Sequence, residues 1–224
     1  HCAAFTNVDA AESDNEKCRK INYEGTLNIA RSCEKHGLKL LYTSTDYVFS
    51  GEGIQAFETD SPKAPCNYYG QSKLDGEKII EEICSKYFIV RISWVFGENG
   101  KNFVKTMLRL AKERSEITVV CDQTGSPTYT KDLAKLLCTM IASEKYGVYH
   151  ATNEGFCSWA EFAETIMEYS QSETKIIPVT SAEYKSVAAR PANSRLSKKS
   201  LDENGFERLP SWQNALKRFL ENVN

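Results

Sequence analysis

Apolar residues follow two alternating patterns along this chain: short continuous runs, and longer stretches with helical spacing. The short runs predict buried strands at 38–42, 87–92, 117–120 and 147–151. The helical spacing predicts helices at 14–36, 67–86, 102–114, 132–142, 158–169 and 211–224. Strands that alternate with helices are typical of βαβ units. The pattern therefore predicts an α/β fold with a doubly wound, Rossmann-like parallel sheet.

Each predicted strand runs directly into a segment rich in polar and special residues. The four segments are Thr43-Ser44-Thr45-Asp46, Ser93-Trp94, Asp122-Gln123-Thr124-Gly125 and Thr152-Asn153. Open parallel sheets bind ligands beyond the carboxyl ends of their strands. We therefore expect all four segments to meet at one edge of one sheet and to form a site there.

Tyr69 and Lys73 are four residues apart on a predicted helix, so they share one face of it. A phenol has an unperturbed pKa of about 10, and a nearby ammonium group favours the phenolate and lowers that pKa. The pair therefore makes a sensible general acid/base unit. The spacing is weak on its own, because roughly one such pair is expected by chance in this chain and a solvated helix face would show it too.

The context of the pair strengthens the hypothesis. Thr45 follows a predicted buried strand, and the helix with Tyr69 and Lys73 begins about two dozen residues later. A hydroxyl at that place can bind a substrate carbonyl and position it beside Tyr69. Ser44 is the rival hydroxyl, and Thr45 could instead cap a turn.

Composition excludes several other classes of function. The 28 Lys and Arg against 30 Asp and Glu leave a net charge of −2, which favours neither nucleic acid nor a membrane surface as partner. No apolar run of about 18 residues or signal peptide is visible. The 8 cysteines form no C-x-x-C pair, so we expect buried free thiols and a cytoplasmic location. The 3 histidines are far apart, and we expect no metal cluster.

Several longer motifs resemble the extended short-chain dehydrogenase/reductase family and, within it, the dTDP-4-dehydrorhamnose reductases. Ser-Thr-Asp-Tyr-Val-Phe and Gln-Thr-Gly-Ser-Pro-Thr are far more specific than Tyr-x-x-x-Lys, and their order agrees. The matching segments extend along almost the whole chain: 2–6, 8–12, 22–25, 44–49, 69–77, 91–97, 102–104, 122–128 and, more weakly, 190–191.

The resemblance implies a role for each matching position. Tyr69 would donate the proton to a sugar ketone, Lys73 would assist it and bind the nicotinamide ribose, and Thr45 would bind the ketone oxygen. The implied cofactor-binding residues are Ala3, Ala4, Thr6, Ser44, Tyr69 and Lys73. The implied substrate-binding residues are Asp46, Tyr47, Trp94, Asn102, Thr128 and Arg190. Trp94 could equally be a core aromatic, and Arg190 a surface arginine.

The resemblance also implies the reaction and the organisation of the chain. NADPH or NADH would reduce the 4-keto group of a dTDP-6-deoxyhexose, with Mg²⁺ as a further cofactor in some relatives. Residues 1–150 would be the remainder of the cofactor-binding domain. Residues 151–224, with contributions from about 97–118, would form a small α/β substrate lobe. We expect a homodimer.

The sequence departs from the family pattern at its start. A dinucleotide-binding fold opens with a strand and a glycine-rich turn, and neither Gly51/Gly53 nor Gly97/Gly100 fits that motif. His1-Cys2-Ala3-Ala4 resembles the end of the family's fourth strand, which would place His1 roughly 60 residues into the fold. We therefore expect weak dinucleotide binding by these 224 residues, and self-association through an open sheet edge.

Two other functions stay open on the same fold. The chain could be a non-catalytic regulatory subunit, like the β subunit of methionine adenosyltransferase, which resembles this family. It could also be a sugar-nucleotide epimerase or dehydratase. Dehydratases usually add acidic residues beside the catalytic hydroxyl, and Asp46 alone fits that only in part.

Overall fold

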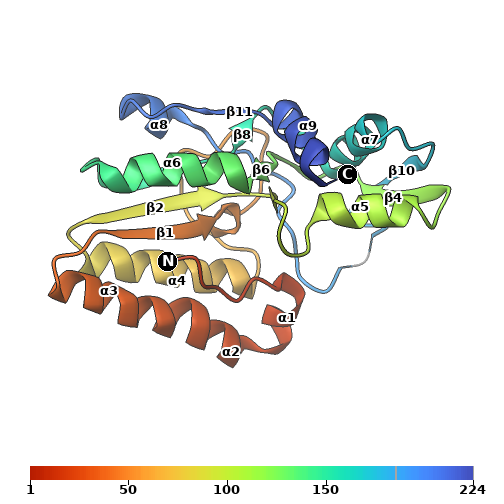
Figure 1. The fold of residues 1–224 in the computed structure, drawn as a ribbon. Coiled ribbons are helices and arrows are strands. Elements are labelled where there is room, and N and C mark those ends of the chain that lie inside the picture. Colours follow the sequence, from red (N-terminus) through yellow and green to blue (C-terminus); the bar gives the residue numbers. More distant parts are fainter. Residues whose placement is uncertain (185, 224) are drawn as a thin grey trace.

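A three-stranded parallel sheet, in the order β1-β2-β7, forms the centre of the larger part of the molecule (Figure 1). This computed structural model describes residues 1–184 and 186–223. Helix α4 packs on one face of the sheet with α3 outside it, and α6 covers the other face. The predicted α/β class with parallel strands is confirmed.

Every predicted strand and helix has a counterpart in the structure, which also contains further elements that were not predicted. The α-helices are α1 (Val8–Ser13), α2 (Asn15–Arg19), α3 (Gly25–Lys35), α4 (Tyr68–Ile83), α5 (Phe103–Ala111), α6 (Thr130–Ala142), α7 (Trp159–Tyr169), α8 (Lys199–Glu203) and α9 (Trp212–Val223). The longer strands are β1 (Leu40–Thr45), β2 (Tyr87–Ile92), β4 (Glu116–Val120), β7 (Gly147–His150) and β10 (Lys175–Val179). Short strands pair as β3 (Val95–Phe96) with β6 (Thr128–Tyr129), β5 (Thr124–Gly125) with β9 (Cys157–Ser158), and β8 (Asn153–Glu154) with β11 (Leu209–Ser211).

Helix α4, which carries the candidate catalytic pair, is fixed at its start and along its inner face. The Asn67 side chain accepts a hydrogen bond from the Gly70 backbone N–H at 2.8 Å, a standard N-cap. Gly76 lies so close to the sheet that an added Cβ would be 2.6 Å from the Tyr42 hydroxyl and 3.0 Å from the Asn22 carbonyl. This close approach sets the depth at which α4 sits against β1.

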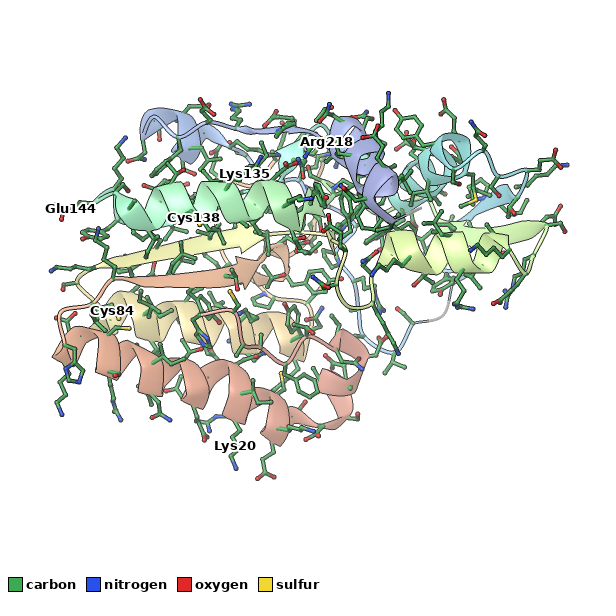
Figure 2. The ribbon with its side chains drawn as sticks, in the orientation of Figure 1. Lys20, Cys84, Lys135, Cys138, Glu144 and Arg218 are labelled. Atoms are coloured by element: carbon green, nitrogen blue, oxygen red, sulfur yellow. The ribbon has the colours of Figure 1, made fainter. Side chains whose placement is uncertain are left out.

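The predicted helix at 14–36 is interrupted in the structure. A π-helical turn, Lys20–Glu24, joins α2 to α3. Within this turn Asn22 is buried, and its amide group hydrogen-bonds to Phe5 and to the Ser72 hydroxyl on α4. Apolar spacing alone does not distinguish this turn from an α-helix. Lys20 extends away from the sheet on the exposed side of the same helical segment (Figure 2).

The prediction of four strand ends at one edge of one sheet is wrong for β4. This strand pairs with β10, which was not predicted, in a separate two-stranded sheet. The two strands pack with α5, α7 and α9 around a second apolar core. Strand β10 was not predicted, because its short apolar run contains Pro178, and a proline within a run argues against a strand.

The C-terminal third of the chain contributes to both cores. Helices α7 and α9 supply much of the core around β4. Leu201, Phe206 and Leu209 instead pack against residues of β2, α6 and β7. Arg218 on α9, labelled in Figure 2, links α9 to α6 through hydrogen bonds of 2.8 and 2.6 Å to Asp132.

A buried ion pair joins α4 to the sheet. Arg91 on β2 donates two hydrogen bonds, 2.9 and 2.7 Å long, to the carboxylate of Glu77 on α4, and both side chains are 1% exposed. Arg91 also donates to the Thr59 carbonyl at 2.8 Å and lies 3.3 Å from the ring of His150 on β7. Such a pair resists displacement because breaking it leaves an uncompensated buried charge. None of the described helices is long and apolar enough to cross a membrane.

Candidate functional site

A cleft of about 450 Å³ opens beyond the carboxyl ends of β1 and β2. The ends of these two strands, the first turns of α4 and the N-terminal segment of the chain all contribute to its wall. The lining residues are Cys2, Ala4, Thr6, Val8, Thr43, Ser44, Thr45, Asp46, Tyr47, Tyr69, Lys73, Ile92, Ser93, Trp94, Val95 and Trp159. The cleft therefore brings together the three predicted catalytic residues, at the sheet edge where the sequence placed them.

Tyr69 lies in the first turn of α4, and its ring meets that of Tyr47 edge-on, with 5.7 Å between ring centroids. We expected a lowered pKa for this phenol, but burial raises the pKa of Tyr69, and the nearby Thr45 hydroxyl opposes that rise only in part. Desolvation penalises the phenolate. The phenol therefore stays protonated near neutral pH, which is the form that a proton donor requires.

Lys73 lies one turn further along α4 and is 2% exposed. Its Nζ donates a hydrogen bond of 2.7 Å to the Thr43 carbonyl and sits 3.9 Å from the centroid of the Tyr42 ring. Burial lowers the pKa of Lys73 to about 7, and the charge of Glu77 opposes this change. An ammonium group has three donors, so two remain to bind a ligand in the cleft.

Thr45 and Asp46 form a connected pair at the end of β1. The Thr45 hydroxyl donates to Asp46 Oδ1 at 3.0 Å and accepts a hydrogen bond from the Tyr47 N–H at 3.2 Å. The second carboxyl oxygen, Oδ2, is buried and has no hydrogen-bond partner among the described residues. Burial raises the pKa of Asp46 to about 6, while Ser194 and Thr45 lower it.

Not every residue expected to bind the cofactor lines the cleft. Ser44 does, and its buried hydroxyl has no partner among the described residues. Ala4 and Thr6 also contribute, whereas Ala3 is exposed and is not among the lining residues. Its neighbour Cys2 lines the cleft instead, because side chains alternate in direction along an extended segment.

Two tryptophans form the aromatic wall of the cleft. Trp94 stacks on Trp159, with ring centroids 3.7 Å apart and an angle of 14° between the planes. Trp94 has a φ of 50°, a left-handed conformation that is rare for a bulky residue. Gly125 makes room for it, since a Cβ there would be 2.8 Å from the indole. Sequence reasoning missed Trp159, because no local pattern pairs it with a residue 65 positions away.

Trp159 also lines a second cavity, of about 220 Å³, beside α5 and β4. The other lining residues are Phe103, Met107, Thr118, Val119, Val120, Gln123, Tyr184, Ser186 and Arg190. Arg190 is held there by Asp9, whose carboxylate accepts a hydrogen bond from its guanidinium at 2.8 Å. This interaction holds the pKa of Asp9 below its usual range.

Two predicted substrate-binding residues are engaged elsewhere. Thr128 is fully buried, and its hydroxyl donates to the Ser93 carbonyl at 2.6 Å. Asn102 caps α5 by accepting from the Lys105 N–H and donating to the Gly97 carbonyl. Neither is among the lining residues of the two cavities. The Thr128 hydroxyl thus holds the backbone next to Trp94, and the Asn102 side chain holds the start of α5.

The cysteines are all free, as expected, but burial was predicted correctly for only some of them. Cys18, Cys84 and Cys157 are buried, Cys33 is partly buried, and the other four are exposed. No group of three or more His, Cys, Asp or Glu among the described residues is arranged to hold a metal ion.

The sequence is similar to known proteins along its whole length. The family profile "RmlD substrate binding domain" matches residues 1–224. The spore coat polysaccharide biosynthesis protein SpsK of Bacillus subtilis is 45% identical over 219 residues, which are 98% of this chain and 77% of that protein. The dTDP-4-dehydrorhamnose reductase of Escherichia coli (strain K12) is 38% identical over 236 residues, covering 100% of this chain and 78% of its own length.

A solved structure extends the likeness to three dimensions. The crystal structure of dTDP-4-dehydrorhamnose reductase from Bacillus anthracis, in complex with NADP, superposes with a TM-score of 0.97 at 46% identity. The alignment covers 99% of this chain and 79% of that one.

Proposed function

The chain belongs to the RmlD family of dTDP-4-dehydrorhamnose reductases, and from this premise we propose that it reduces the 4-keto group of a dTDP-6-deoxyhexose with a nicotinamide cofactor. The meeting of Thr45, Tyr69 and Lys73 on one cleft carries the proposal. In this assignment, the central sheet is part of the Rossmann-like cofactor-binding domain, and the elements around β4 form the substrate lobe.

The residues of the cleft fit the nicotinamide end of such a cofactor. The space of about 450 Å³ is of the size that ligand pockets have. The unpartnered Ser44 hydroxyl and the spare donors of Lys73 supply polar groups for a ribose or a carboxamide. The related reductase from Bacillus anthracis was crystallised with NADP, which favours NADPH. When bound, the reduced nicotinamide supplies a hydride to the keto carbon.

Residues of the chain then protonate and stabilise the ketone oxygen. Tyr69, protonated because of its raised pKa, gives its phenolic proton to that oxygen as the carbonyl becomes a secondary alcohol. Thr45 holds the same oxygen and stabilises the charge that develops on it. The buried ammonium of Lys73 stabilises the phenolate that Tyr69 leaves behind.

The second cavity is the place proposed for the nucleotide part of the substrate. Phe103, Met107 and Trp159 offer apolar surface to a base, and the Arg190 guanidinium matches a diphosphate. Trp159 lines both spaces, so one bound molecule can extend from the reacting carbon to the nucleotide.

Ketone-dependent oxidation of NADPH tests the proposal and separates it from its alternatives. The purified protein is mixed with NADPH and dTDP-4-dehydrorhamnose. We expect loss of absorbance at the NADPH band together with formation of dTDP-rhamnose. An epimerase or dehydratase would convert a nucleotide sugar without net NADPH oxidation. A regulatory subunit would give no conversion at all, and either result would reject the proposal.

A further inference from the structure

The Thr45 hydroxyl cannot serve the ketone in the arrangement that the structure has. Its single hydrogen points to Asp46 Oδ1 at 3.0 Å, and the Tyr47 N–H occupies one of its lone pairs. A hydroxyl has one hydrogen to donate. As long as that hydrogen binds the carboxylate, Thr45 offers no donor to a substrate oxygen in the cleft.

The buried surroundings of Asp46 favour a change in its protonation state. It is 4% exposed, it lines the cleft, and its Oδ2 has no partner among the described residues. A buried carboxylate oxygen without a donor is costly, and protonation removes most of that cost. Burial accordingly raises the pKa of Asp46 to about 6, so about one tenth of Asp46 is neutral at pH 7 and about half at pH 6.

We propose that Asp46 is a positioning residue that sets the direction of the Thr45 hydrogen, and that only neutral Asp46 leaves this hydrogen for the substrate's carbonyl oxygen. The inference rests on the proposed function. Neutral Asp46 can donate its own hydrogen to Thr45 Oγ1, which makes a continuous chain of donors from Asp46 through Thr45 to the ketone. Ionised Asp46 reverses the first link and removes Thr45 from the reaction.

The sign of the pH dependence follows from this arrangement. Asp46 is neutral below pH 6 and ionised above it, so reduction at saturating substrate falls as the pH rises through about 6. The phenols of Tyr47 and Tyr69 and the thiol of Cys66 also feel the Asp46 charge, and all stay neutral here because their pKa values are raised. Lys73 lines the same cleft and loses its charge near pH 7, which gives a second, separate decline in the rate of reduction.

Asp46→Asn tests the inference through the pH profile of reduction. Loss of one donor to a developing oxyanion costs about 10²- to 10³-fold in kcat at the extreme, and we expect the wild-type rate to fall at least about tenfold between pH 5 and pH 8. In Asp46→Asn the decline with a midpoint of about 6 disappears, and the Lys73 decline near 7 remains. Asp75→Asn, a carboxylate on α4 that is not among the residues lining the cleft, keeps the wild-type profile. A decline with a midpoint of about 6 that persists in Asp46→Asn would overturn the inference.

Carbon-13 NMR of the aspartate carboxyls gives a readout that needs no turnover. The Asp46 signal, identified by its loss in Asp46→Asn, should titrate near pH 6 in the wild-type protein and at higher pH in Thr45→Val, because Thr45 stabilises the ionised form. Titration near the ordinary value of about 4, or no change in Thr45→Val, would refute the coupling. If the coupling is present but NADPH is never oxidised, the proposed function fails rather than the Asp46–Thr45 link.

Discussion

The two cavities that Trp159 lines differ in the number of buried polar groups in their walls. The cleft at the sheet edge has buried polar groups in its wall, including Ser44, Thr45, Asp46 and Lys73. The second cavity has Arg190 as its charged group and only Gln123 as a buried polar group. Buried polar groups have shifted pKa values and suit proton transfer, whereas a cavity with one partly exposed cation suits binding. Changes in the cleft should therefore alter kcat, and changes in the second cavity should alter KM.

The largest effect is expected from Tyr69→Phe. Removing the proton donor should lower kcat about 10³-fold, within the range for general acid catalysis, and leave the Kd for NADPH almost unchanged. Steady-state kinetics and fluorescence titration measure the two quantities. Tyr68→Phe is the matched control, since Tyr68 is the adjacent tyrosine and is not among the residues lining the cleft. Turnover of Tyr69→Phe at the wild-type rate would reject the assignment.

A smaller effect is expected from Arg190→Gln, in the second cavity. Loss of the guanidinium should raise KM for the nucleotide sugar about tenfold, which corresponds to the weaker end of a charge-assisted hydrogen bond. The kcat should stay within about twofold. Arg208→Gln removes another arginine paired with an aspartate, Asp202, and should leave both constants unchanged. A large loss of kcat in Arg190→Gln would break the division between the two cavities.

The smallest effect is expected at Gly125, which lies against the Trp94 indole in the wall of the cleft. In Gly125→Ala the new Cβ meets the Trp94 indole at 2.8 Å and the Ser194 Cβ at 3.0 Å. Overpacking of this kind costs about 1 kcal/mol, a fall in Tm of about 2–4 °C. Thermal unfolding followed by circular dichroism measures it. Gly25→Ala, in a helix where a Cβ finds ordinary contact distances, should not lower Tm. If the two variants have the same Tm, the close contact with Trp94 does not destabilise Gly125→Ala.

Much of the cleft could be predicted because its parts are close in the sequence. Thr45 ends an apolar run, and Tyr69 and Lys73 are one turn apart on a helix with a recognisable N-cap at Asn67. The residues that the prediction missed or misplaced depend on distant partners. Thr128 turned inward because its hydroxyl binds Ser93, which is 35 positions away.

The sequence by itself determined the local structure: the alternation of strands and helices, the helix that carries the acid/base pair, and the polar end of β1. Periodicity and capping act over a few residues, so they can be read directly from the chain. Only the tertiary structure decided that β4 pairs with β10 rather than with the central sheet, that Trp94 stacks on Trp159, and that Asp9 holds Arg190 from 181 positions away. These contacts depend on packing between segments that no local pattern relates to one another, because burial and pairing are properties of the assembled chain.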